Sequence, residues 1–231
     1  QNNCRSHPRQ AAQLTGKLPP SASVALPLEQ GKLFAPSAER NVPAILALLE
    51  AVAPAHGRAL EIASGTGQHV TAFAAALPAL RWYPTEIAPD RLASIDAYAT
   101  AAGLPNLYPA TILNAACSGW GTSHTPYDLI YLGNLLHLIP RDAAQTVLQE
   151  AAQALTPTGR LVIYGPFMRA GVLTSEGDRK FHGELCAADP EIGYKNDDWV
   201  RQVLVSSRLT VTEVREMPAN NQSFIAQPET T

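Results

Sequence analysis

Arg58-Ala-Leu-Glu-Ile-Ala-Ser-Gly-Thr-Gly67 is the stretch that decides the fold, because a short apolar segment runs directly into a glycine turn. Residues 58–62 are predicted to form a buried strand. Gly65 and Gly67 allow the backbone to turn tightly and to approach a bound molecule closely. Apolar residues at 70, 73, 74 and 77 then predict a helix, whose first N–H groups are free to bind an anionic group. A strand, a glycine turn and a helix in this order are typical of an open α/β sheet, in which a ligand binds outside the carboxyl ends of the strands.

The same alternation continues along the chain. An amphipathic helix is predicted from Ser37 to about Val52, ahead of the first strand. Because strands alternate with helices at this spacing, we expect an α/β fold with a mostly parallel sheet and helices on both faces. Further strands are predicted at residues 81–87, 107–113, 127–132, 160–164, 210–216 and 223–226, and further helices at 89–102, 141–155, 176–187 and 197–207.

The N-terminal region differs from the rest. Residues 1–32 are expected to form a flexible tail, and residues 33–231 a single domain. The tail lacks a sustained helical or strand period, is rich in proline and holds no acidic residue before Glu29. Its mildly basic character leaves a remnant of an organellar targeting segment as the alternative interpretation.

Composition and charge bear on partners and location. The net charge of -3 gives no clustered basic field, so nucleic acid is not expected as a partner. The longest apolar run, around residues 129–139, is interrupted by polar residues and glycine, so no membrane partner is expected either. Cys4, Cys117 and Cys186 are odd in number and widely scattered, which favours a reducing compartment. A cytoplasmic location is therefore predicted, and the oligomeric state is left open.

The residues around the glycine turn favour a cationic adenosyl ligand over a dinucleotide. A dinucleotide site prefers a third glycine where Val70 stands. Glu61 lies inside the strand, four residues before Gly65, where its carboxylate would repel a pyrophosphate but tolerate an ammonium or sulfonium group. Glu86 ends the second strand, nineteen residues after Gly67, where an acid can accept hydrogen bonds from both ribose hydroxyls.

A third strand end adds to this pattern. Asn114 is expected to hydrogen-bond an adenine edge, and the nearby Trp120 could stack on the ring. Each residue also has a plainer interpretation, Asn114 as a turn former, Trp120 as a core residue and Glu86 as a solvated strand end. Since Gly65, Glu86 and Asn114 fall at three successive strand ends, one ligand would reach all of them. Their combination favours an adenosyl cofactor.

Six longer motifs can be compared with known families, namely Phe34-Ala-Pro-Ser-Ala-Glu-Arg-Asn41, Leu60-Glu-Ile-Ala-Ser-Gly-Thr-Gly-Gln-His69, Asn134-Leu-Leu-His-Leu-Ile-Pro140, Tyr164-Gly-Pro-Phe167, Thr174-Ser-Glu176 and Met217-Pro-Ala-Asn-Asn-Gln-Ser223. They resemble the methyltransferase-like family catalogued as domain of unknown function 938, over about residues 33–227. The resemblance implies a Rossmann-like class I methyltransferase fold, with a seven-stranded sheet whose last strand is antiparallel. It also implies S-adenosyl-L-methionine as cofactor and no particular acceptor. Asn114 stands where members commonly carry Asp.

Methyl transfer from a sulfonium is an in-line displacement, in which the enzyme aligns the nucleophile, excludes water and removes a proton from a weak nucleophile. It requires no metal, and none is predicted. His137, just past the fourth strand, is the predicted general base, with a structural histidine as the alternative. Tyr164, at the end of the fifth strand, is the second catalytic candidate because it could orient an acceptor, and packing is its alternative role.

Two further residues are expected near the cofactor. Asn134 lies three residues before His137, so the two share a face if this stretch is a helical turn. Arg40 is expected to pair with the cofactor carboxylate, and an exposed arginine at a helix start is its alternative. The predicted cofactor-binding residues are therefore Arg40, Glu61, Gly65, Gly67, Glu86, Asn114 and Asn134.

The function predicted from the sequence is an S-adenosylmethionine-dependent methyltransferase with a small-molecule acceptor. The apolar residues within 167–173 favour an acceptor that is partly apolar. Two alternatives stay open. The protein could use S-adenosylmethionine as a bound ligand for a non-methylating reaction, or it could be a non-catalytic partner subunit. A degenerate subunit would be expected to lose Gly65, Gly67 or Glu86, and none is lost.

Overall fold

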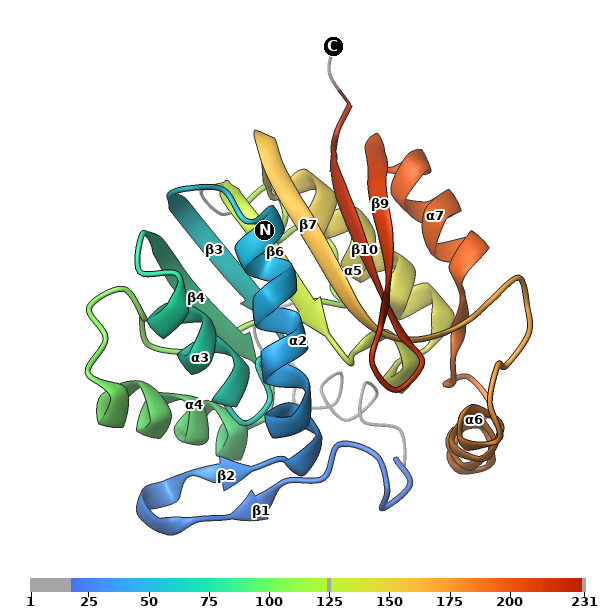
Figure 1. The fold of residues 1–231 in the computed structure, drawn as a ribbon, viewed down its shortest axis with the longest axis horizontal. Coiled ribbons are helices and arrows are strands. Elements are labelled where there is room, and N and C mark those ends of the chain that lie inside the picture. The colour runs from blue at the N-terminus through green and yellow to red at the C-terminus, as the bar shows by residue number, and fades with distance from the viewer. Residues whose placement is uncertain (1–17, 124–125, 230–231) are drawn as a thin grey trace.

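The centre of the protein is a mixed sheet, described by a computed structural model that covers residues 18–123 and 126–229 (Figure 1). The strands lie in the order β5-β4-β3-β6-β7-β10-β9, and β10 is antiparallel to both of its neighbours. This arrangement confirms the predicted α/β fold with an antiparallel last strand. The bounds are β3 (Gly57–Ile62), β4 (Leu80–Glu86), β5 (Thr111–Ile112), β6 (Tyr127–Gly133), β7 (Leu155–Met168), β9 (Leu209–Met217) and β10 (Asn221–Pro228).

Strand order reverses beside β3, because the chain first builds β4 and β5 on one side and then β6 and β7 on the other. All pairings among β3, β4, β5, β6 and β7 are parallel, so their carboxyl ends meet at one edge of the sheet. Ligands of open α/β sheets bind outside these ends, at the reversal point.

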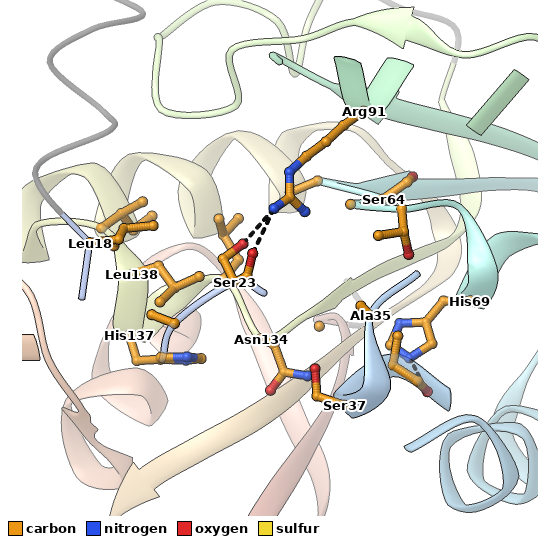
Figure 2. A pocket seen from close by; sticks show the side chains of 18 of the residues that line it. Leu18, Ser23, Ala35, Ser37, Ser64, His69, Arg91, Asn134, His137 and Leu138 are labelled. Atoms are coloured by element: carbon orange, nitrogen blue, oxygen red, sulfur yellow. Dashed lines mark hydrogen bonds between the residues drawn. The ribbon is translucent and has the colours of Figure 1, made fainter. Parts of the chain in front are cut away.

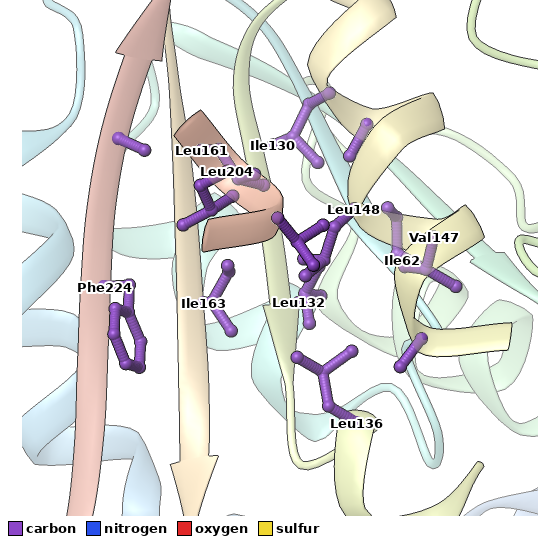
Figure 3. Packing of buried hydrophobic residues seen from close by; sticks show 14 of the residues in the cluster. Ile62, Ile130, Leu132, Leu136, Val147, Leu148, Leu161, Ile163, Leu204 and Phe224 are labelled. Carbon is purple, nitrogen blue, oxygen red and sulfur yellow. The ribbon is translucent and has the colours of Figure 1, made fainter. Parts of the chain in front are cut away.

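Helices cover both faces of the sheet (Figure 1). Those that pack on one face are α2 (Pro36–Val52), α3 (Gln68–Ala76) and α4 (Pro89–Ala102), and those on the other are α5 (Arg141–Gln153) and α7 (Asp197–Ser206). Figure 3 shows the core beneath α5 and α7, where Ile62 and Leu132 of neighbouring strands lie near Val147 and Leu148 of α5. Successive strand side chains point to opposite faces, so a strand covered on both sides is apolar at nearly every position.

Three details of the sheet differ from the prediction. The strand predicted at residues 160–164 extends over Leu155–Met168 as β7, so Tyr164 lies inside this strand and not at its end. The strand expected at residues 107–113 is reduced to Thr111–Ile112, with an isolated bridge at Leu107. Pro109 has no N–H to give to the ladder, and this interrupts the edge strand. A short strand that the sequence pattern does not predict, β8 (Lys195–Asn196), pairs with the end of β7 and adds an eighth strand beside the predicted seven.

Part of the predicted tail is packed on the domain. β1 (Leu26–Pro27) pairs with β2 (Leu33–Phe34) around the short helix η2 (Glu29–Gly31). The small apolar side chain of Ala22 is buried in one cluster with Leu185 of α6 (Glu176–Ala188). The packed domain therefore begins before residue 33, whereas the predicted tail residues 1–17 lie outside the described residues.

Residues 18–24, called the strap below, connect α6 to α4. The Ser21 hydroxyl donates to a Glu184 carboxylate oxygen at 2.6 Å. At the other end, Arg91 Nη2 donates to the carbonyl and the hydroxyl of Ser23, both at 2.9 Å. These bonds hold the strap across the edge of the sheet where the parallel strands end.

Two expectations about the environment of the protein can be compared with the structure. None of the helices in the described ranges combines the length and apolar character that a membrane crossing requires. Cys186 is a free thiol. The reducing compartment and the cytoplasmic location stay predictions.

Candidate functional site

A cavity of about 710 Å³ lies at the carboxyl ends of the central strands. Its volume falls in the range of ~300–1,000 Å³ that is usual for small-molecule and cofactor sites. The wall is built from the strap, α2, the turns after β3, β4, β5 and β6, and α6 (Figure 2). Six of the nine predicted site residues line it: Arg40, Gly65, Glu86, Asn114, Asn134 and His137. The other three, Glu61, Gly67 and Tyr164, are not among its lining residues.

The turn after β3 is fastened to the end of β4. Gly65 has a φ of +59° and donates its N–H to Glu86 Oε2 at 3.0 Å. Glu86 Oε1 accepts the N–H of Ile87 at 2.8 Å, so both carboxylate oxygens are held. Ser64 donates its N–H to the Thr85 carbonyl at 2.8 Å, which adds a second tie between the two strand ends. Each carboxylate oxygen has a further lone pair with which it can accept a bond from a ligand hydroxyl.

Gly67 supports this turn from behind the pocket wall. Its φ is +93°, and a Cβ at this position would lie 2.8 Å from the Cα of Ile95 in α4. A glycine is therefore required both by the backbone conformation and by the close approach of α4. Gly67 thus has a packing role, and its predicted contact with a ligand stays a prediction.

Glu61 is buried in the strand rather than in the pocket wall. Its side chain is 1% exposed, and Oε2 has no hydrogen-bond partner among the described residues. Burial, and then the negative charge of Glu86, raise the pKa of Glu61 to about 8. A buried carboxyl oxygen without a partner costs stability. A cationic ligand bound nearby would favour the ionised form and offset part of this cost.

Of the two residues predicted to contact adenine after β5, one lines the pocket and the other lies in the core. Asn114 lines the pocket, and its Oδ1 accepts the N–H of Ala116 at 3.2 Å in an Asx-type turn. The amide NH₂ of Asn114 is the group left for a ligand. Trp120 is 6% exposed, donates from Nε1 to the Ala115 carbonyl at 3.0 Å and belongs to the core beneath α5. The plainer interpretation of Trp120 as a core residue is therefore correct.

Two arginines line the pocket. Arg40 of α2 lines the pocket and is exposed, which fits both its predicted pairing with a ligand carboxylate and its alternative as an exposed arginine at a helix start. Arg91, in the first turn of α4, lies beside the glycine turn, because a Cβ on Gly65 would meet its Nη1 at 3.4 Å (Figure 2). No local pattern points to Arg91, since its bonds to Ser23 span 68 positions of the chain.

His69 is a pocket residue that the motif contained but the sequence argument did not assign. Its Nε2 lies 3.2 Å from the Ala38 carbonyl, and its ring stacks on Phe73 with 5.6 Å between centroids. Burial lowers the pKa of His69 to about 4, so the ring is neutral at pH 7. Because a carbonyl only accepts, Nε2 carries the proton and Nδ1 is left as a hydrogen-bond acceptor.

The turn after β6 brings Asn134 and His137 to the pocket together, as the sequence predicts (Figure 2). Asn134 has a φ of +55° and donates its N–H to the Tyr164 carbonyl at 2.8 Å. His137 follows in the short helix η3 (Leu136–Leu138). Burial, and then the positive charge of Lys195, lower the pKa of His137 to about 3. The imidazole is therefore neutral at pH 7 and a weaker base than a solvated histidine.

Tyr164 lies in the core instead of the pocket wall. Its side chain is 2% exposed and packs in the core on the α2 and α3 side of the sheet. The Tyr164 hydroxyl accepts a hydrogen bond from Asn221 Nδ2 at 3.0 Å, and burial raises the pKa of Tyr164 to about 12. The structure fits the packing alternative, because Tyr164 belongs to the core and reaches the cavity only through Asn221, which lines it.

The family comparison covers nearly all of the domain. Residues 32–227 match the family described as "Protein of unknown function (DUF938)". The matched range contains all nine predicted site residues and begins between η2 and β2, before α2.

Solved structures with the same fold are methyltransferases of low sequence identity. An O-methyltransferase family protein from Burkholderia thailandensis aligns with a TM-score of 0.73 at 16% identity, over 84% of this chain and 57% of its own. An O-methyltransferase family 2 protein from Planctomyces limnophilus, in complex with apigenin, gives 0.71 at 18% identity, over 84% and 58%. The O-methyltransferase NcsB1 from neocarzinostatin biosynthesis, in complex with S-adenosylmethionine and 2-hydroxy-5-methyl naphthoic acid, gives 0.68 at 12% identity, over 84% and 55%. The chain thus has a Rossmann-like methyltransferase fold and spans somewhat more than half the length of these proteins.

Proposed function

We propose that this chain, which belongs to the family described as "Protein of unknown function (DUF938)", is an S-adenosylmethionine-dependent methyltransferase with a small, partly apolar acceptor. The observation that carries the proposal is the convergence of four strand ends on one cavity. The cavity is lined by one residue from the end of each of these strands. They are Gly65 after β3, Glu86 as the last residue of β4, Asn114 after β5 and Asn134 after β6. Local pattern alone would leave each of them as an ordinary turn residue.

The chemistry of these residues fits an adenosyl ligand that carries an amino acid. Glu86 is held with free lone pairs at the pocket, which suits a pair of ribose hydroxyls. The NH₂ of Asn114 suits a ring nitrogen, and the Arg40 guanidinium suits a carboxylate. The Nδ1 atom of neutral His69 can accept a hydrogen bond from an ammonium group. The buried Glu61 Oε2, which has no hydrogen-bond partner among the described residues, would favour a positive charge in the same region.

S-adenosylmethionine supplies an activated methyl group on a sulfonium, so the protein need only align the acceptor and exclude water. His137 and Asn134 contribute polar atoms to the cavity on the turn after β6. The lowered pKa of His137 makes it a hydrogen-bond partner that orients the acceptor, and a weaker general base than the sequence argument assumed. An acceptor that binds in its neutral form and loses its proton to water as the methyl group is transferred suits this arrangement.

Titration calorimetry tests the cofactor. The purified protein should bind S-adenosylmethionine and its demethylated product, S-adenosylhomocysteine, and its melting temperature should rise with either. NAD serves as the control ligand, because it shares the adenosine but brings a pyrophosphate. Tight NAD binding without a response to either sulfur compound would overturn the proposal.

Turnover separates the enzyme from its alternatives. S-adenosylmethionine labelled in the methyl group is incubated with the protein and mixtures of small phenols, thiols and amines, and the label is followed into product. Transfer of the label supports the methyltransferase. Binding of the cofactor with a chemical change in the acceptor but no transfer of label would favour a non-methylating reaction.

A further inference from the structure

Three aromatic rings from different elements form one corner of the pocket. They are His137 of η3, Phe181 of α6 and Tyr194, which immediately precedes β8. The ring centroids of His137 lie 5.7 Å from Phe181 and 6.1 Å from Tyr194, and those of Phe181 and Tyr194 are 6.2 Å apart. All three pairs meet edge to face, at 64°, 69° and 71°. A flat ring that enters such a corner can make edge-to-face or offset contacts with more than one wall.

Hydrogen bonds hold this corner in place. The Tyr194 hydroxyl donates to Asp178 Oδ1 at 3.3 Å, and the Tyr194 N–H donates to His182 Nδ1 at 3.0 Å. The neighbouring Gly193 donates its N–H to the His137 carbonyl at 3.0 Å, which ties the two ring-bearing segments together. A ligand that fits between fixed walls loses less free energy to ordering than one that must assemble them.

The charged groups next to the corner are engaged with the protein itself. Asp178 is buried, and its carboxylate accepts from Thr174 Oγ1 at 3.1 Å and from the Ser175 N–H at 3.2 Å, besides Tyr194. Lys195 donates from Nζ to the carbonyls of Ile139 at 2.8 Å and Gly193 at 3.0 Å. Neither Asp178 nor Lys195 is among the described residues that line the pocket.

The corner itself is uncharged. The charged side chains among the described lining residues are Arg40, Glu86 and Arg91, which belong to α2, β4 and α4. The lowered pKa of His137 keeps its imidazole neutral at pH 7. An ammonium placed at this corner would lose its hydration and gain no charged partner among the described lining residues. A carboxylate would face only the charge of Lys195, which lies outside the lining and already donates to two carbonyls.

The strap supplies an apolar wall to the same region. Leu18 and Ala22 line the pocket and pack in one cluster with Leu138, Ile192 and Tyr194. Leu18 and Leu138 lie near His137 (Figure 2), so aliphatic as well as aromatic side chains border this part of the pocket.

We infer that the methyl acceptor is a planar, uncharged aromatic molecule, bound between His137, Phe181 and Tyr194 with one polar group directed to His137. This inference rests on the proposed function, since it names the acceptor class of that same site. The rigid edge-to-face walls favour a flat ring, and the absence of charge from the described corner disfavours an ionic one.

Three probes of one carbon skeleton test the inference: 2-naphthol, 2-naphthoate and decahydro-2-naphthol. Their binding is measured by calorimetry to the protein alone and to the protein saturated with S-adenosylhomocysteine. 2-Naphthol should bind in both series, and the charged and the non-planar probes should bind at least about 10-fold more weakly. Failure of 2-naphthol to bind, or equal binding of the three, overturns the inference. Failure of S-adenosylhomocysteine to bind counts against the proposed function instead. In that case the relative affinities of the three probes for the protein alone still test whether the site prefers a planar, uncharged ring.

A variant assigns the effect to the corner. Phe181→Leu keeps an apolar side chain but removes the ring, and should weaken 2-naphthol about 3- to 10-fold while leaving S-adenosylhomocysteine affinity unchanged. Tyr108→Leu is the control, because Tyr108 stacks on Tyr83, with 4.6 Å between centroids, and is not a pocket residue. A melting curve of each variant shows that it is folded. Unchanged 2-naphthol affinity in folded Phe181→Leu would contradict the role of this ring.

Discussion

Glu86 Oε2 accepts the backbone N–H of Gly65 at 3.0 Å, so the end of β4 supports the turn after β3. The other carboxylate oxygen accepts the N–H of Ile87, and the group is therefore oriented before a ligand arrives. One side chain thus joins two strand ends and offers its remaining lone pairs to the cavity.

Replacement of Glu86 should weaken cofactor binding. Glu86→Ala removes acceptors for two ligand hydroxyls, and should cost about 1.5–3 kcal/mol, roughly 10- to 100-fold in affinity for S-adenosylmethionine. Titration calorimetry measures the loss. Glu50→Ala, an exposed glutamate of α2, is the matched control and should bind normally. If folded Glu86→Ala binds the cofactor as the native protein does, the carboxylate serves only the turn.

The two glycines with positive φ that cap helices should differ sharply in their tolerance of alanine. Gly67→Ala places a Cβ 2.8 Å from the backbone of Ile95 and strains a φ of +93°, so it should destabilise the fold by several kcal/mol. Gly103→Ala meets nothing within 4 Å at a φ of +59°, and should cost only about 1 kcal/mol. Urea denaturation of both variants compares them. Equal losses would show that α4 shifts to make room at Gly67.

The stability of the ligand-free protein should depend on pH through Glu61. Burial raises the pKa of Glu61 from 4.5 to about 8, so the folded state binds this proton more tightly than the unfolded chain. The stability from this group is complete below pH 4.5 and is lost as the pH rises towards 8. Glu61→Gln cannot ionise, and should therefore raise the melting temperature, relative to the native protein, more at pH 8 than at pH 5.

Calorimetric melting at both pH values, with Glu50→Gln as the exposed control, checks this prediction. A Glu61→Gln effect of the same size at pH 5 and pH 8 would mean that the carboxyl is not held neutral in the folded protein.

His137 should influence turnover without imposing a pH dependence near neutrality. Because burial and Lys195 lower the pKa of His137 to about 3, the ring stays neutral from pH 5 to pH 8. We expect His137→Ala to leave cofactor affinity nearly unchanged and to lower turnover about 10-fold or more, by the same factor across this range. Rates and melting are measured on one preparation, once an acceptor is in hand.

Two other outcomes would be informative for His137. Partial recovery of the lost rate at high pH would indicate a general base, as the sequence argument supposed. A lower melting temperature with normal turnover of the folded fraction would indicate a structural histidine.

The sequence by itself determined the order of elements and the residues at the strand ends. Apolar periods of two and of 3.6 residues separate strands from helices without knowledge of their neighbours. Parallel strands that share a sheet end at the same edge, so Gly65, Glu86 and Asn134 could be placed together once their strands were recognised. The short strands were harder to predict. Whether residues around Pro109 and the two residues of β8 pair as strands depends on which strand lies beside them, and the local sequence does not show this.

Only the tertiary structure decided which side chains face the cavity. Tyr164 is predicted at a strand end like Glu86, yet β7 continues to Met168 and pairs with β10 at this position, so the Tyr164 side chain packs in the core. His69, Arg91 and Phe181 enter the pocket through contacts between elements far apart in the chain. No local period encodes such contacts, since they arise from how helices, strap and sheet pack together, and packing is a property of the whole fold.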